Sequence, residues 1–165
     1  MRIRRTRDLI LVVDCWVTEP DTDGQHELSS LINVACNRER DYGATIIHVS
    51  TLPTDTTQIA TGGDLCYTHL GSKEFIAQVR LEQYDNLYLV GFHYDSCVHQ
   101  MYQDLAAILK DDSRIAIALN LTLPYTKTDA PMNPWVLRTA NIRHVMWSEQ
   151  GFDPIYVNAV PRFIV

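Results

Sequence analysis

Apolar residues along this chain gather in short continuous runs, and segments with helical spacing lie between the runs. Five runs are rich in leucine and β-branched residues, which is typical of parallel strands that are buried on both faces. They cover residues 8–14, 44–49, 86–92, 114–121 and 144–147. The alternation predicts a doubly wound α/β fold, in which helices cover both faces of a mostly parallel sheet and form three layers.

The expected order of the five strands contains a point at which the strand order changes direction. In the order 2-1-3-4-5 the reversal falls between 8–14 and 86–92, and ligands bind beyond the carboxyl ends of strands at such a point. Asp14 ends the first of these strands, and Cys97 follows the other after a tight turn. Topology alone therefore predicts that a carboxyl group and a thiol share one crevice.

The segments between and after the strands include helices, a long loop and a tail. Helices are predicted over 23–41, from residue 72 onward, over 97–110 and over 134–140. The segment 50–71 is rich in Thr, Asp and Gly with little periodicity, and a loop of this length usually covers or builds a site. The tail over 148–165 ends in an apolar segment and is interpreted as a docking tail.

Length, charge and cysteine content narrow the class of protein. With 165 residues of ordinary globular composition, the chain is expected to form one domain over 1–165. Its net charge of −6 argues against nucleic acid and anionic membranes as partners, and no apolar run is long enough to span a bilayer. The four cysteines are widely spaced and indicate reduced thiols, so a soluble protein of the cytoplasm is expected.

The segment from Gly91 to Val98 carries the clearest chemical signal of the sequence. It lies between a predicted strand and a predicted helix, so Cys97 is expected on the first turn of that helix. There the unpaired amides and the helix dipole favour a thiolate and can stabilise an oxyanion on a bound carbonyl. The remaining cysteines lack such a position and are interpreted as buried structural thiols: Cys15, Cys36 and Cys66.

Two motifs of the chain resemble the isochorismatase-like cysteine hydrolase superfamily, which includes nicotinamidases and N-carbamoylsarcosine amidohydrolases. The first is the strand Leu9-Ile-Leu-Val-Val-Asp14, which ends in an aspartate, and the second is the turn Gly91-Phe-His-Tyr-Asp-Ser-Cys97-Val98. The α/β alternation agrees with that family over residues 8–147.

The resemblance implies roles for individual residues. Cys97 would be the nucleophile and Asp14 the general base in an attack on an amide or vinyl-ether carbon. A cis peptide bond between His93 and Tyr94 would shape, together with Cys97, the oxyanion hole. A small-molecule substrate and a homo-oligomer are also implied. The metal-binding pattern of nicotinamidases is missing from the sequence, so neither a metal nor another cofactor is expected.

The chain departs from the family at the third member of the catalytic triad. The family's lysine position falls on Gly63, and no lysine stands there. Four residues are candidates for the missing positive charge: His69, His93, Lys73 and Lys127. In addition, Tyr94 replaces a small threonine in the turn, and Trp16 stands where the family has glutamine.

The missing lysine leaves two functions open. Without its charge, Asp14 and a Cys97 thiolate repel each other, so the nucleophile is expected to weaken. One function is weak thiol-dependent hydrolysis of a small amide or related C–N substrate, and the other is a catalytically degenerate protein with a binding or assembly role. A flavodoxin-like nucleotide or flavin binder ranks last, because no glycine-rich phosphate turn follows Val13.

Overall fold

The computed structural model describes residues 7–15, 25–50, 65–68, 79–92, 94–123 and 142–155. Within these residues the strands form one seven-stranded sheet of the order β3-β2-β1-β4-β5-β6-β7. The strands are β1 (Asp8–Val13), β2 (Thr45–Ser50), β3 (Leu65–Thr68), β4 (Asn86–Phe92), β5 (Ile115–Leu123), β6 (His144–Ser148) and β7 (Gly151–Ile155). Neighbouring strands are parallel except β6 and β7, which pair antiparallel.

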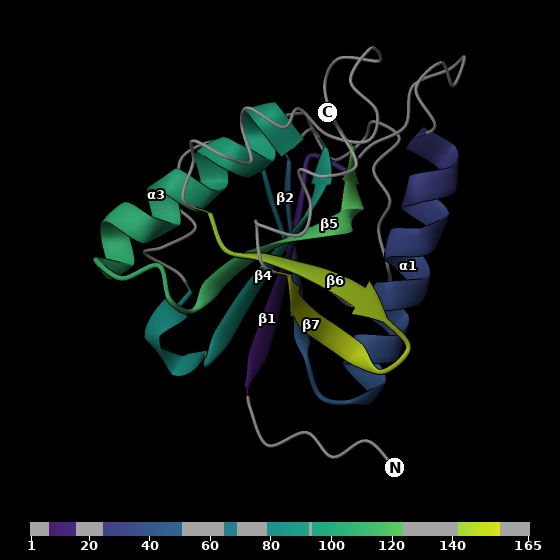
Figure 1. Cartoon of the computed structure of the whole chain (residues 1–165), viewed down its shortest axis with the longest axis horizontal. Coiled ribbons are helices and arrows are strands. Elements are labelled where there is room, and N and C mark those ends of the chain that lie inside the picture. The colour runs from purple at the N-terminus through teal and green to yellow at the C-terminus, as the bar shows by residue number, and fades with distance from the viewer. Residues whose placement is uncertain are drawn as a thin grey trace.

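Two α-helices lie on opposite sides of this sheet, as Figure 1 shows. Helix α1 (Gln25–Asp41) follows β1, and helix α3 (His99–Leu109) precedes β5. A 3₁₀ turn, η1 (Leu81–Gln83), precedes β4, and a π-helical turn, η2 (Tyr94–Val98), separates β4 from α3. In the described part of the chain, neither helix is long and apolar enough to cross a membrane.

Each face of the sheet buries its own apolar core. Alternate residues of a strand point to opposite faces, so Leu11 of β1 packs with Leu105 of α3, while Val12 packs in the core of Ile32 of α1. This burial on both faces explains why the central strands occur in the sequence as unbroken apolar runs.

The predicted fold class and the predicted order of five strands are confirmed. The strands expected in the order 2-1-3-4-5 are β2-β1-β4-β5-β6. β4 has the predicted bounds, and the other four strands differ from their predicted bounds by no more than two residues at either end.

Two strands, β3 and β7, were missing from the sequence-based expectation. β3 lies within 50–71, which the sequence predicted to be a loop, and its four residues are too few for a periodic signal. β7 lies in the predicted docking tail and contains Pro154, which argues against a central strand but is tolerated at a sheet edge. Both strands lie at the two edges of the sheet, where pairing with one neighbour determines the structure.

Several predicted elements lie outside the described residues. These are residues 72–78 of the helix predicted from residue 72 onward, the helix predicted over 134–140 and most of the 50–71 segment. Residues 156–165 of the tail lie outside them too, so the docking role of the tail stays a prediction.

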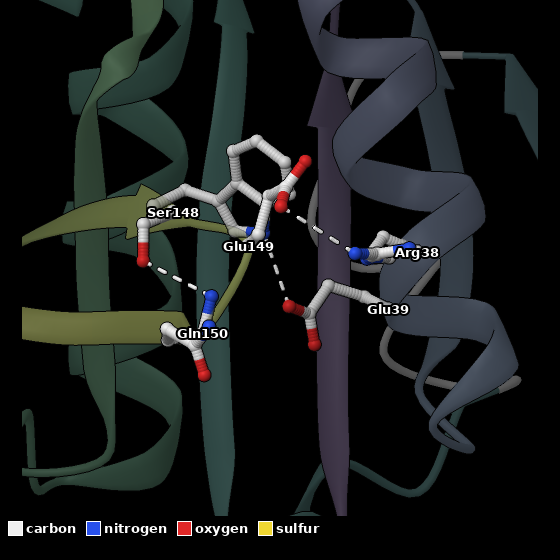
Figure 2. Close-up of polar contacts among 6 residues, drawn as sticks. Arg38, Glu39, Ser148, Glu149 and Gln150 are labelled. Carbon is white, nitrogen blue, oxygen red and sulfur yellow. Dashed lines mark hydrogen bonds and ion pairs between the residues drawn. The ribbon is translucent and has the colours of Figure 1, made fainter. Parts of the chain in front are cut away.

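A polar contact attaches β6 to α1. The indole Nε1 of Trp147 donates a hydrogen bond to Oε1 of Glu39 over 3.0 Å, and Glu39 is 0% exposed. Figure 2 shows Glu39 and Arg38 of α1 beside the turn that joins β6 to β7, where Arg38 pairs with Glu149 over 3.6 Å. The β6–β7 hairpin is therefore fastened to the α1 layer.

Candidate active site

The candidate site lies where the neighbouring parallel strands β1 and β4 end. Val13, the last residue of β1, is paired with Gly91 in β4. Asp14 directly follows β1, and the turn η2 with Cys97 follows β4 after one residue. Because parallel strands end at the same edge of a sheet, the predicted carboxyl group and thiol both belong to this edge, at the reversal of the strand order. That the two side chains face each other stays a prediction.

The two strand ends approach so closely that only glycine fits in β4. Gly91 has φ +115°, and a Cβ atom built on it would lie 2.1 Å from the backbone oxygen of Val13. A side chain there would collide with the backbone of β1, which has no freedom to move away within the sheet. Gly91 therefore sets the distance between the two strands at the position from which both candidate catalytic segments begin.

Asp14 is held by its backbone. Its φ of 47° lies in the left-handed region, which aspartate occupies more readily than most non-glycine residues. Its N–H donates to the carbonyl of Val49 at the end of β2 over 2.8 Å, and the residue is buried. The backbone of the first residue beyond β1 is thus held by a hydrogen bond to the neighbouring strand β2.

Cys97 lies in the π-helical turn η2 and not, as predicted, in the first turn of an α-helix. α3 begins two residues later, at His99. The sequence pattern missed the difference because Val98 and Met101 keep a helical spacing through the turn while both enter the same core. Cys97 is half-buried and packs against that core. The amides near the thiol are therefore those of η2 and of the start of α3.

Tyr94, the residue that replaces the family's threonine, lies in the core of the α3 face. Its hydroxyl is 2.7 Å from Nε2 of His144, and the centres of the two rings are 5.8 Å apart. The sequence counted Tyr94 as a bulky departure within the site, but its ring packs beneath the turn. Sequence reasoning missed the contact of Tyr94 with His144, because the two residues are 50 positions apart along the chain and meet only in the folded structure.

His144 is neutral at physiological pH. Burial lowers its pKa from 6.5 to about 4, and a hydrogen bond with the backbone of Ile142 offsets part of this effect. A backbone contact that raises the pKa is one in which the ring N–H donates to a carbonyl. The ring then has a single proton, used toward Ile142, so Nε2 accepts from the hydroxyl of Tyr94.

The candidates for the missing positive charge lie outside the described residues: His69, Lys73, His93 and Lys127. The predicted cis bond between His93 and Tyr94 and the position of Trp16 are outside them as well. Lys110 is described, and it follows the last residue of α3, roughly 16 Å along an 11-residue helix from its start. Arg114 and Arg143 precede β5 and β6 and donate to backbone carbonyls at the amino ends of the strands, away from the carboxyl ends where Asp14 and Cys97 lie. The four candidates for a cation beside Asp14 and Cys97 therefore stay predictions.

The other thiols have environments that differ from that of Cys97. Cys15, Cys36 and Cys97 are all reduced. Burial raises the pKa of Cys15 to about 12, while a hydrogen bond with Ser29 acts in the opposite direction, so this thiol stays protonated at neutral pH. Cys36 belongs to α1 and is buried in the core between this helix and the sheet. The prediction of structural thiols thus fits both residues, while the side chain of Cys66 is not described.

A metal centre has no counterpart in the described part of the chain. No group of three or more His, Cys, Asp or Glu side chains there is arranged to hold a metal ion.

Comparison with known proteins shows the fold to which this geometry belongs. The sequence matches no protein-family model and no curated protein. Among solved structures, an isochorismatase family protein from Burkholderia thailandensis is similar with a TM-score of 0.60 and 10% identity, over 82% of this chain and 91% of that chain. A nicotinamidase from Staphylococcus aureus has a TM-score of 0.59 and 14% identity, over 82% of this chain and 96% of that chain.

A third similar structure, a hypothetical protein from Trypanosoma cruzi, has a TM-score of 0.58 and 14% identity, over 92% of this chain and 80% of that chain. The chain is thus an α/β protein whose candidate site lies at the reversal of a parallel sheet. More specifically, it has the isochorismatase-like fold, as the two sequence motifs predicted.

Proposed function

We propose that this chain is a thiol-dependent hydrolase of small amides or related C–N substrates, with Cys97 as nucleophile and Asp14 as general base. The pairing of Val13 with Gly91 carries the proposal, because it brings the segments of both residues to one edge of neighbouring strands. The half-buried Cys97 differs from Cys15, whose burial keeps its thiol protonated. The fold shared with a nicotinamidase and an isochorismatase family protein supports the same chemistry.

The reaction that these groups would perform has two stages. Asp14 takes the proton of the Cys97 thiol, and the sulfur attacks the carbonyl carbon of the amide. The C–N bond then breaks, the amine leaves with the proton from Asp14, and a thioester remains on Cys97. Water, deprotonated by Asp14, attacks the thioester, which releases the acid and returns the proton to the thiol. N–H groups of η2 and of the start of α3 would stabilise the oxyanion in both stages.

The expected rate is lower than that of enzymes with the complete triad. Position 63 holds glycine, and the candidates for a positive charge between the carboxylate and the thiolate are His69, His93, Lys73 and Lys127. Without such a charge the two anions disfavour each other, and loss of one triad member commonly costs orders of magnitude in rate. Self-association and a small-molecule substrate remain part of the proposal.

A catalytically degenerate protein with a binding or assembly role is the second candidate. Gly63 at the lysine position and Trp16 at the glutamine position favour it. Tyr94 no longer counts in its favour, because the ring of this residue lies in the core.

The test is an assay of the purified chain against nicotinamide, isochorismate and simple carbamoyl amides. We expect slow turnover that Cys97→Ala reduces by at least about 10³-fold and Asp14→Asn also reduces strongly. Cys36→Ala is the matched control, since it removes a buried thiol on the other face of the sheet and should retain turnover. Turnover that survives Cys97→Ala would contradict Cys97 as the nucleophile, and no turnover in the unmodified chain would support the second candidate.

A further inference from the structure

The turn that carries Cys97 is held in the core by residues on both sides of the thiol. Tyr94, three residues before Cys97, is 1% exposed, and Val98, the residue after it, is 0% exposed. Both side chains belong to the core between the sheet and α3. Between them, Cys97 is half-buried, so its position depends on how firmly these two anchors hold the turn.

The anchor at Tyr94 is polar and directional. Its hydroxyl donates to Nε2 of His144 over 2.7 Å, and His144 is itself 2% exposed. His144 is fixed in turn by its place as the first residue of β6, where it pairs with Ile117 of β5. A hydrogen bond between two buried rings defines one orientation of Tyr94, whereas an apolar contact such as that of Val98 tolerates small shifts.

We propose that Tyr94 is a positioning residue, which uses its hydrogen bond to His144 to fix the η2 turn in the conformation that activates Cys97. The inference rests on the proposed function. It assigns to this chain's own tyrosine the task of aligning the turn amides with the sulfur, since small displacements of a nucleophile reduce its reactivity strongly.

A second buried tyrosine on the same face provides a matched control. Tyr102 of α3 is in the same core, its hydroxyl donates to Asp112 over 3.4 Å, and the N–H of Arg143 donates to it over 3.3 Å. Asp112 and Arg143 precede β5 and β6, so this contact lies at the amino ends of the strands, whereas η2 follows the carboxyl end of β4. Tyr94→Phe and Tyr102→Phe each remove one buried hydroxyl, but only the first acts on the turn.

The experiment measures alkylation of Cys97 by iodoacetamide in the full chain across pH, followed by mass spectrometry of the peptide that contains Cys97. The alkylation rate at neutral pH divided by the plateau rate at alkaline pH gives the thiolate fraction. A change in the exposure of the sulfur alters both rates equally, so it does not change this ratio. We expect Tyr94→Phe to lower this ratio by at least about fivefold and Tyr102→Phe to leave it within about twofold. His144→Gln, which retains a side-chain acceptor, should keep more of the ratio than His144→Leu.

The possible failures of the inference and of the proposed function can be told apart. An unmodified chain whose ratio is that of an ordinary thiol would overturn the activation of Cys97 by the turn, and with it the inference, while hydrolysis with Asp14 as general base would still be decided by the turnover assay. A high ratio in the unmodified chain that Tyr94→Phe leaves unchanged, or that Tyr102→Phe lowers equally, would overturn the positioning role alone.

Discussion

Strand β6 makes a buried polar contact on each face of the sheet, and the two contacts serve different parts of the molecule. On the α3 face, His144 accepts from Tyr94, which begins the turn that carries Cys97. On the α1 face, Trp147 donates to Glu39, which lies near the end of α1, just before the chain returns to the start of β2. If Tyr94 has the proposed positioning role, the first contact serves the candidate site and the second the scaffold, so stability and reactivity should respond separately to their removal.

The largest effect is expected at Gly91 of β4, which lies directly beside Val13 at the end of β1. Gly91→Ala combines a φ of +115° with a Cβ only 2.1 Å from the oxygen of Val13, and we expect it to reduce the free energy of unfolding by at least about 3 kcal/mol. Gly43→Ala is the control, because its φ is +91° but nothing lies within 4 Å of the added Cβ. Urea unfolding of both variants measures the difference, and equal losses would contradict the close approach.

The central strands could be predicted because burial on both faces leaves an unbroken apolar run. This is how β1 and β4 were found, and their parallel pairing then located Asp14 and the Cys97 turn. β7 could not be found in the same way, because its place depends on pairing with β6 and its sequence includes Asp153 and Pro154. The position of an edge strand depends more on pairing with the neighbouring strand than on its own pattern of apolar and polar residues.

The α3-face contact predicts a loss of stability in acid. The unfolded chain protonates His144 near pH 6.5 and the folded chain only near pH 4, so between these values protons favour the unfolded state. Stability should therefore fall as the pH drops through this window, by roughly 3 kcal/mol in total from this residue. Urea unfolding between neutral pH and about pH 4 should show a smaller loss in His144→Gln, and parallel pH profiles would contradict the prediction.

The α1-face contact should influence stability alone. Trp147→Phe removes one donor to the fully buried Glu39, and we expect it to reduce the free energy of unfolding by about 2 kcal/mol. The thiolate fraction of Cys97 should stay as in the unmodified chain. A change in that fraction similar to the one in Tyr94→Phe would show that the two faces are not separable.

The smallest effect is expected at the exposed pair beside that contact. Arg38 and Glu149 are 3.6 Å apart with side chains 47% and 74% exposed, so solvent screens their attraction (Figure 2). Arg38→Ala should alter the free energy of unfolding by less than about 0.5 kcal/mol. A loss as large as that of Trp147→Phe would mean that the ion pair, and not the buried contact, fastens β6 to α1.

The candidate site could be predicted from the sequence only in part. Asp14 and Cys97 follow from strand ends, which the sequence marks clearly. His144 does not, because its contact with Tyr94 joins residues that are far apart along the chain. The π-helical form of η2 was hidden as well, since its buried residues keep the spacing of the helix that follows.

The most direct test of the account is to look for a covalent intermediate on Cys97. The chain is mixed with the amides of the assay, quenched with acid during turnover, and digested for mass spectrometry. The account predicts that the peptide with Cys97 gains the mass of the acyl group of the amide, while the peptides with Cys15 and Cys36 do not. Turnover without an acyl group on Cys97, or equal acylation of the buried thiols, would contradict it.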